Sequence, residues 1–166
     1  MSICIIDTSI FCNILKVPGK SQEHSFVMHL MKEKIQGGES LLLPMTSIIE
    51  TGNHIAQNGD GRQKRTCAEK FAKQLQGAIA GEAPWTPMKP FAIEEFLRWL
   101  GEFPDYAMRD IGFGDLSIIK DWEELQKIHS GQRVYIWTLD NDLKGYDYTP
   151  KRSPRPVAET KPINNK

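Results

Sequence analysis

The chain has 166 residues, which is enough for one domain with its own core and too few for two ordinary domains. It is 40% hydrophobic and 25% charged, as globular proteins are, and its formal net charge is zero. This balance excludes a uniformly basic nucleic-acid binder, although a local basic patch can still bind a polyanion. We expect one domain over residues 1–148 and a basic, disordered tail over residues 149–166, which has few apolar residues.

The cysteines and the N-terminal segment favour a cytoplasmic protein. Cys4, Cys12 and Cys67 make an odd number, and we interpret them as reduced thiols. The N-terminal segment reaches Asp7 with neither a basic leader nor a long apolar run, so no signal peptide is expected. No stretch approaches the roughly 20 apolar residues of a membrane span, so no membrane partner is expected.

Short apolar runs alternate with amphipathic segments along the chain. Strands are predicted at 3–6, 40–43 and 133–139, and the proline-limited segment 83–90 is expected to be extended, with a short strand. Helices are predicted from 8 to about 15 and at 21–37, 45–58, 62–81, 92–100 and 114–131. Ser21 is predicted to cap the second helix, and Gly101 and Pro104 to end the fifth. The alternation predicts an α/β fold with three layers, α/β/α, around a central parallel sheet.

Carboxylates follow two of the predicted strands. Asp7 ends the first strand, where ligands bind in parallel α/β sheets, although an aspartate there can also simply cap the next helix. The strand at 133–139 runs into Thr138, Asp140 and Asp142, and these two aspartates also suit a turn. Because parallel strands end at the same edge of a sheet, we expect these acids to lie close together.

Two further acids lie on predicted helices. Asp115 falls in the middle of the apolar stripe of its helix, so its carboxylate faces inward and needs either a cation or a role as helix cap. Glu50 shares a helix face with Asn53 and His54, and this face has no lysine or arginine. We interpret it as the lining of a polar cleft, with a solvated surface as the alternative, above all for His54. The opposite face is expected to be buried through Met45, Ile48, Ile49, Gly52, Ile55 and Ala56.

Converging carboxylates predict a site for a divalent cation. Close acids repel one another unless a cation neutralises them, and Mg²⁺ and Mn²⁺ prefer oxygen ligands. Phosphodiester hydrolysis uses such ions to activate water and to stabilise the leaving oxygen. The sequence has no histidine–cysteine cluster of the zinc type, no phosphate-binding loop ending in Gly-Lys-Ser/Thr and no Gly-x-Ser-x-Gly motif. Metal chemistry with acidic ligands is therefore favoured.

Two other enzyme classes also place an aspartate after the first strand. A haloacid-dehalogenase-like phosphatase requires a second aspartate two residues after the nucleophile, where this chain has Ser9. A receiver domain requires adjacent acids after the first strand and a lysine after a late strand, and neither is evident. Both classes are disfavoured on these residues.

The acids and their strand contexts resemble the PIN domains, metal-dependent nucleases that include the toxin ribonucleases of VapC-like toxin–antitoxin pairs. The resemblance spans most of residues 3–147 and is carried by "IIDTSIF", by Glu50 after the second strand, by "GDLSII" and by "WTLDNDL". It implies a parallel sheet between helices and an endoribonuclease activity that depends on Mg²⁺ or Mn²⁺. The family's four acids fall on Asp7, Glu50, Asp115 and Asp140.

The resemblance also suggests supporting residues and partners. Ser9 and Thr138 match the hydroxyl positions that orient the acids, and Asp142 matches an additional acid of many relatives. Asn53 and His54 are expected to support the cleft because they share the polar face of the Glu50 helix. RNA is the expected substrate. On their charge alone, Arg62, Lys64 and Arg65 are expected to contact its phosphates, with a solvated helix face as the alternative. A toxin would have an antitoxin partner with a basic side chain in the acidic cleft. Homodimers are common in the family, and the apolar stripe of helix 21–37 suits either a dimer interface or the core. The remaining alternative is a PIN-like module that binds nucleic acid or protein with little or no catalysis.

Overall fold

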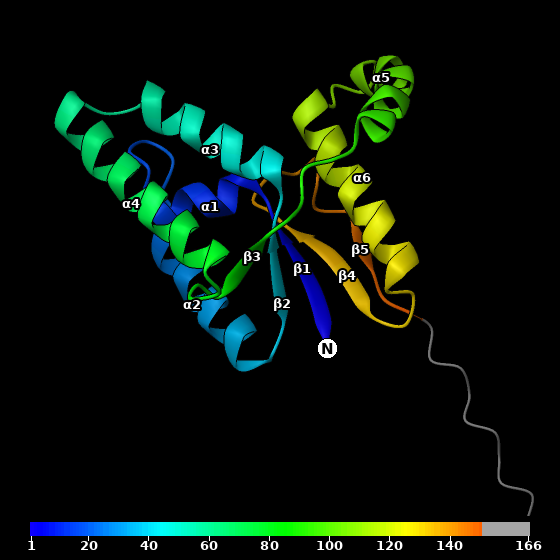
Figure 1. The fold of residues 1–166 in the computed structure, drawn as a ribbon, viewed down its shortest axis with the longest axis horizontal. Coiled ribbons are helices and arrows are strands. Elements are labelled where there is room, and N and C mark those ends of the chain that lie inside the picture. The colour runs from blue at the N-terminus through cyan, green and yellow to red at the C-terminus, as the bar shows by residue number, and fades with distance from the viewer. Residues whose placement is uncertain (151–166) are drawn as a thin grey trace, which may run out of the picture.

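The computed structural model describes residues 1–150, so the predicted tail falls almost entirely on residues 151–166, outside the described part. The strands are β1 (Ser2–Ile6), β2 (Ser40–Leu43), β3 (Trp85–Pro87), β4 (Arg133–Trp137) and β5 (Asp147–Tyr148). The helices are α1 (Thr8–Leu15), α2 (His24–Gln36), α3 (Met45–Gln57), α4 (Gly61–Ile79), α5 (Ile93–Ala107) and α6 (Phe113–Ile128). Figure 1 shows their arrangement around one sheet, which confirms the predicted α/β class.

The sheet has the strand order β3-β2-β1-β4-β5. The first four strands run parallel, as predicted for the central sheet. The fifth strand, β5, was not predicted and is antiparallel to β4. The sequence analysis missed β5 because a strand of two residues has no periodicity to detect. An ion pair holds this edge, since Arg133 on β4 donates two hydrogen bonds, of 2.9 and 2.6 Å, to the carboxylate of Asp147.

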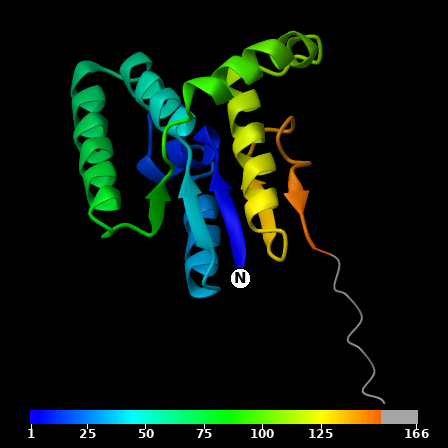
Figure 2. The ribbon, with the colours of Figure 1, turned by 45° about the vertical axis from the view of Figure 1, so that its right-hand side comes forward.

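Helices cover both faces of the sheet, as the near-continuous apolar strands predicted. Side chains alternate along β1: Cys4 and Ile6 face the core under α1, α2 and α4, whereas Ile3 and Ile5 face α6. Figures 1 and 2 show α1, α2 and α4 on one side of the sheet and α5 with α6 on the other. Among residues 1–150, no helix is both long and apolar enough to cross a membrane.

Helix α2 begins later than predicted and belongs to the core. Its first residue is His24, after a turn in which the His24 N–H donates to the Ser21 carbonyl, so Ser21 is not the helix cap. Val27 and Met31 are buried in the core, whereas Phe26 and Ile35 on the same helix are exposed. The apolar stripe of α2 therefore packs mainly into the core, which was one of its two predicted roles.

Helix α5 continues through the predicted break at Gly101 and Pro104 to Ala107. A proline inside a helix removes one backbone hydrogen bond and costs roughly 3 kcal/mol. Aromatic packing onto α6 offsets this cost, because Phe96 and Phe103 both contact Phe113 edge-on, with ring centroids 5.5 and 5.1 Å apart. The break was predicted from local preference, and tertiary packing overrides it.

Asp121 on α6 gives this helix pair a pH-dependent stability. Burial and the nearby carboxylate of Glu95 raise the pKa of Asp121 from 3.8 to about 7. The folded state therefore binds this proton more tightly, so the contribution of Asp121 to stability is greatest below pH 3.8 and is lost as the pH rises through about 7. Asp121→Asn should stabilise the protein by roughly 1–3 kcal/mol at mildly alkaline pH and have little effect below about pH 4. Urea unfolding across this pH range measures the effect, with the exposed Asp105→Asn as control. Equal shifts in both variants would contradict it.

Candidate functional site

The register of the two central strands brings Asp7 next to Thr138. Ile6 pairs with Trp137 in the parallel β1–β4 ladder, and the Asp7 N–H donates to the Trp137 carbonyl over 3.1 Å. The residues that follow each strand consequently meet at the carboxyl edge of the sheet. Asp7 is only 4% exposed there, so its carboxylate is buried among polar partners.

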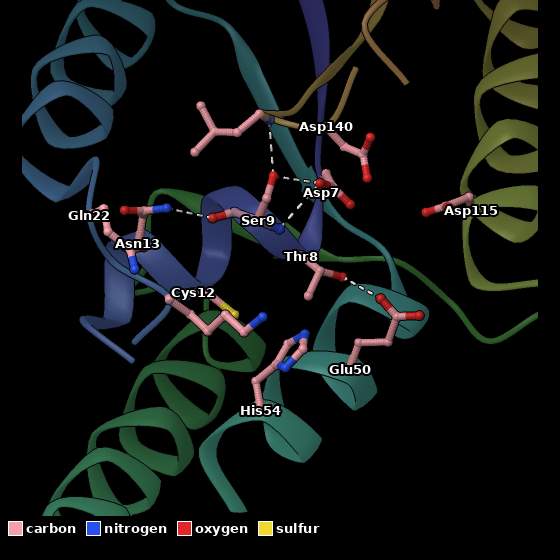
Figure 3. A pocket seen from close by; sticks show the side chains of 12 residues that line it. Asp7, Thr8, Ser9, Cys12, Asn13, Gln22, Glu50, His54, Asp115 and Asp140 are labelled. Carbon is pink, nitrogen blue, oxygen red and sulfur yellow. Dashed lines mark hydrogen bonds between the residues drawn. The ribbon is translucent and has the colours of Figure 1, made fainter. Parts of the chain in front are cut away.

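One oxygen of the Asp7 carboxylate accepts three hydrogen bonds, and Figure 3 shows the two that come from Ser9. Oδ2 accepts from the Ser9 N–H at 3.2 Å, from the Ser9 hydroxyl at 2.6 Å and from the Thr138 hydroxyl at 2.8 Å. Asp7 therefore caps α1, as the simpler interpretation predicted, and it also lines the pocket described below. Within residues 1–150 no donor reaches Oδ1, which leaves this oxygen available to a ligand.

The same two hydroxyl oxygens accept hydrogen bonds that fix the loop after β4. The Leu139 N–H donates to Ser9 Oγ over 3.0 Å, and the Asp140 N–H donates to Thr138 Oγ1 over 2.8 Å. Asp140 Oδ1 accepts from the Asp142 N–H at 3.0 Å, so the predicted turn is present. Asp140 lines the pocket, whereas Asp142 is exposed and does not line it.

Glu50 reaches the site from α3, which is rotated relative to the prediction. The buried face of α3 consists of Ser47, Thr51 and Ile55, whereas the predicted core residue Ile49 is 57% exposed. Small polar residues on this face let α3 lie close to the end of β1, where the Ser47 hydroxyl donates to the Ile6 carbonyl over 3.0 Å. The rotation turns Glu50 toward α1, where the Thr8 hydroxyl donates to its Oε2 over 2.8 Å.

Asp115 faces the same pocket from the first turn of α6. The residue that caps α6 is Gly112, so the alternative that Asp115 is the helix cap is wrong. Burial raises the pKa of Asp115 to about 6, and the negative charges of Asp7, Asp140, Glu50 and Asp142 add to the effect in that order. The charges that add to the effect of burial come from three other parts of the chain: the residue that follows β1, helix α3 and the loop after β4.

The four acids line one cavity of about 340 Å³. Among the predicted supporting residues, Ser9 and His54 line it as well, whereas Asn53 is exposed on α3 and Thr138 lies behind Asp7. The sequence analysis missed further residues on the wall of the cavity, which are Thr8, Cys12, Asn13, Lys20, Gln22 and Leu139. Thr8 and Cys12 are four residues apart on α1, and this spacing was the available signal that one face of α1 meets α3.

The predicted RNA-binding residues lie away from this cavity. Arg62, Lys64 and Arg65 are all on α4, and none of them lines the cavity. Arg65 pairs with Glu69 at 3.0 Å on an exposed face, with 82% of the arginine side chain exposed. Arg62 instead lines a separate groove beside α1. Of the three residues, only Arg62 lines this groove, and Lys64 and Arg65 line neither the groove nor the cavity.

The chemistry of the donor set fits a hard divalent cation. The acids of the cavity offer carboxylate oxygens, and none of Asp7, Glu50, Asp115 and Asp140 has an ion-pair partner within residues 1–150. As placed, no three His, Cys, Asp or Glu side chains of this part of the chain are close enough to hold one ion. Shared coordination of one ion would require inward rotation of these side chains, and a cation would favour this rotation because it offsets their mutual repulsion.

Comparison with known proteins gives no independent guide to this cavity. No protein-family model matches the chain, and no curated protein matches it. The case for its chemistry therefore comes from the geometry described above.

Gly114 on α6 lies against the carboxylate of Glu50. A Cβ atom at position 114 would collide with Glu50 Oε1, while the helical backbone itself accepts alanine. Gly114→Ala should therefore displace the Glu50 carboxylate and lower any metal-dependent activity at least about tenfold, with an unfolding free energy within roughly 1 kcal/mol of wild type. Activity and urea unfolding are measured together, and Gly77→Ala, at an open helical position, is the control. Unchanged activity in Gly114→Ala would contradict the assignment of Glu50.

Proposed function

We propose that the chain is an endoribonuclease that depends on Mg²⁺ or Mn²⁺ and has a PIN-like architecture. The observation that carries the proposal is the convergence of four carboxylates on one cavity at the carboxyl edge of the sheet, with no ion-pair partner for any of them in residues 1–150. A merely structural role does not account for it, because burial of Asp115 and repulsion from the neighbouring acids, which together raise its pKa, destabilise the fold. A bound cation would reverse this cost.

The carboxylates would hold the ion, and the hydroxyls would position them. A bound Mg²⁺ or Mn²⁺ supplies an activated water and stabilises the leaving oxygen of a phosphodiester. Asp7 offers Oδ1 to the cavity, because Ser9 and Thr138 hold Oδ2 in place. Thr8 orients Glu50 in the same way through its 2.8 Å hydrogen bond.

Cleavage of a mixed pool of structured RNA tests the proposal. The purified protein, freed of any bound partner, is incubated with the pool in Mg²⁺, in Mn²⁺ and in EDTA. Internal cleavage in either metal that stops in EDTA is the expected result. Folded protein that leaves the pool intact in both metals would overturn the proposal.

A binding module is the second candidate, and the separation of the acids favours it. No three of these side chains are close enough to hold one ion as they stand in residues 1–150, which suits a cavity that binds without cleaving. RNA that is retained by the protein but stays intact in Mn²⁺ is the result that this candidate predicts. Catalysis remains the first choice because binding of RNA alone does not require a concentration of negative charge.

The proposal extends to location and partners. All three cysteines are free and buried, which suits the reducing cytoplasm. If the enzyme is a toxin, an antitoxin would place a basic side chain against Asp7 and Asp115. Homodimer formation is proposed on the family resemblance alone.

A further inference from the structure

A groove between the end of α1 and helix α4 has the character of a nucleotide-binding site. Its volume is about 520 Å³. Leu15, Pro18 and Cys67 give it an apolar floor, and Lys16, Arg62 and Lys70 supply positive charge along it. Arg62 and Lys70 lie eight residues apart on α4, which places them on the same face of the helix.

The charge of this groove is not neutralised within the described part of the chain. None of the residues that line it is acidic, and Lys16, Arg62 and Lys70 have no ion-pair partner in residues 1–150. Lys70 Nζ donates to the Leu15 carbonyl over 3.2 Å, which holds the lysine across the groove. An anion with an apolar portion complements this combination of cations and apolar floor.

The groove adjoins the acidic cavity across one turn of the chain. Pro18 lines the groove and Lys20 lines the cavity, so wall residues of the two sites are separated only by Gly19, and their Cα atoms are at most about 7 Å apart. The Lys20 N–H donates to the Val17 carbonyl over 3.0 Å, which fixes this turn.

We propose that the groove binds one nucleotide of an unpaired RNA strand that continues into the acidic cavity past Lys20. The cations contact phosphates, and a base packs on the apolar floor. This base must be unstacked from its neighbours, which is possible in an unpaired strand and not in a duplex. The inference rests on the proposed function and narrows its substrate to single-stranded RNA. Of the predicted RNA-binding residues, the inference assigns the phosphate contact to Arg62 rather than to Arg65, whose charge is paired with Glu69.

Binding without catalysis tests the groove separately from the nuclease. Affinity for a fluorescent single-stranded oligoribonucleotide is measured in EDTA over a salt series, for wild type, Arg62→Gln and Lys70→Gln. Each substitution should weaken binding roughly fivefold at low salt and reduce the slope of log affinity against log salt by about 0.7, the value for one lost phosphate contact on a single strand. Lys73→Gln, on the same helix but outside the groove, is the matched control and should change neither quantity.

Two competitors report on the base. A sugar-phosphate oligomer of equal length without bases should compete with the fluorescent strand more weakly than the intact strand does. The affinity of a duplex of the same length should be equal for wild type and Arg62→Gln. The inference would be overturned by unchanged affinity in both groove variants or by an equal loss of affinity in Lys73→Gln. It would also be overturned if wild type did not bind the strand. Equal competition by the oligomer without bases would overturn the base contact.

The two proposals fail in distinguishable ways. If the groove variants weaken binding while wild-type protein never cleaves in Mn²⁺, the groove stands and the nuclease does not. If wild type cleaves and the groove variants bind and cleave as it does, the nuclease stands and the groove does not.

Discussion

Asp7→Asn is expected to abolish metal-dependent RNA cleavage and to leave the fold intact. The three donors around Oδ2 come from Ser9 and Thr138, and each requires an acceptor. An asparagine satisfies them with its carbonyl oxygen and so places its amide nitrogen where Oδ1 now faces the cavity. Asparagine is also as good a helix cap as aspartate, so α1 keeps its N-terminal stabilisation.

The cavity, by contrast, loses a charged ligand. An amide nitrogen donates hydrogen bonds and cannot coordinate Mg²⁺ or Mn²⁺, and the remaining acids attract the cation less strongly. A metal ion contributes several kcal/mol of transition-state stabilisation, so cleavage should fall at least about a hundredfold. The unfolding free energy should stay within roughly 1 kcal/mol of wild type. Asp115→Asn should lose cleavage similarly and should also become more stable at neutral pH, because it removes a carboxylate whose pKa is raised.

Asp60→Asn is the matched control, because Asp60 is also an aspartate helix cap. Asp60 caps α4 by accepting from the Gln63 N–H at 2.8 Å, and it does not line the cavity. Cleavage of the RNA pool in Mn²⁺ and urea unfolding are measured for both variants. Full cleavage by Asp7→Asn would remove Asp7 from the site, and an equal loss in Asp60→Asn would show an effect of helix capping rather than of the cavity.

The sequence predicted the part of the site that strand order dictates. Asp7 and Asp140 follow two parallel strands, and parallel strands end at one edge whatever their neighbours are. The inward direction of Asp115 followed in the same way from helical periodicity, because an apolar stripe fixes which face is turned to the core. Local pattern was sufficient for these residues because each position depends on a single element.

Features that depend on two elements were not predictable in this way. The rotation of α3 accompanies a close contact in which the Ser47 hydroxyl donates to the Ile6 carbonyl, so small polar residues are buried and the predicted core residue Ile49 is exposed. The continuation of α5 through Pro104 requires the rings of α6 beneath it. Lys20 enters the cavity from a turn, and turn residues have no periodicity that reveals where they point.

Phe11→Ala is expected to destabilise the fold far more than any substitution in the acidic cavity. Phe11 is 0% exposed, and its ring meets Trp85 of β3 and Phe71 of α4, with ring centroids 5.7 and 6.4 Å apart. Truncating a buried phenylalanine removes its packing and leaves a cavity, which costs roughly 3–5 kcal/mol. A domain of this kind has about 5–15 kcal/mol of stability in total, so the variant is expected to be close to unfolding at moderate temperature.

Phe26→Ala separates the effect of burial from that of side-chain type. Phe26 on α2 is 52% exposed, so the same change there should alter the unfolding free energy by less than about 1 kcal/mol. Urea unfolding followed by tryptophan fluorescence measures both variants, and Trp85 reports directly because it contacts Phe11. Since α1 carries both Thr8 and Ser9, cleavage by Phe11→Ala should fall in parallel with its folded fraction as temperature rises. Comparable urea midpoints for the two variants would contradict the packing of α1 between α4 and β3, and with it the placement of the hydroxyls that orient Asp7 and Glu50.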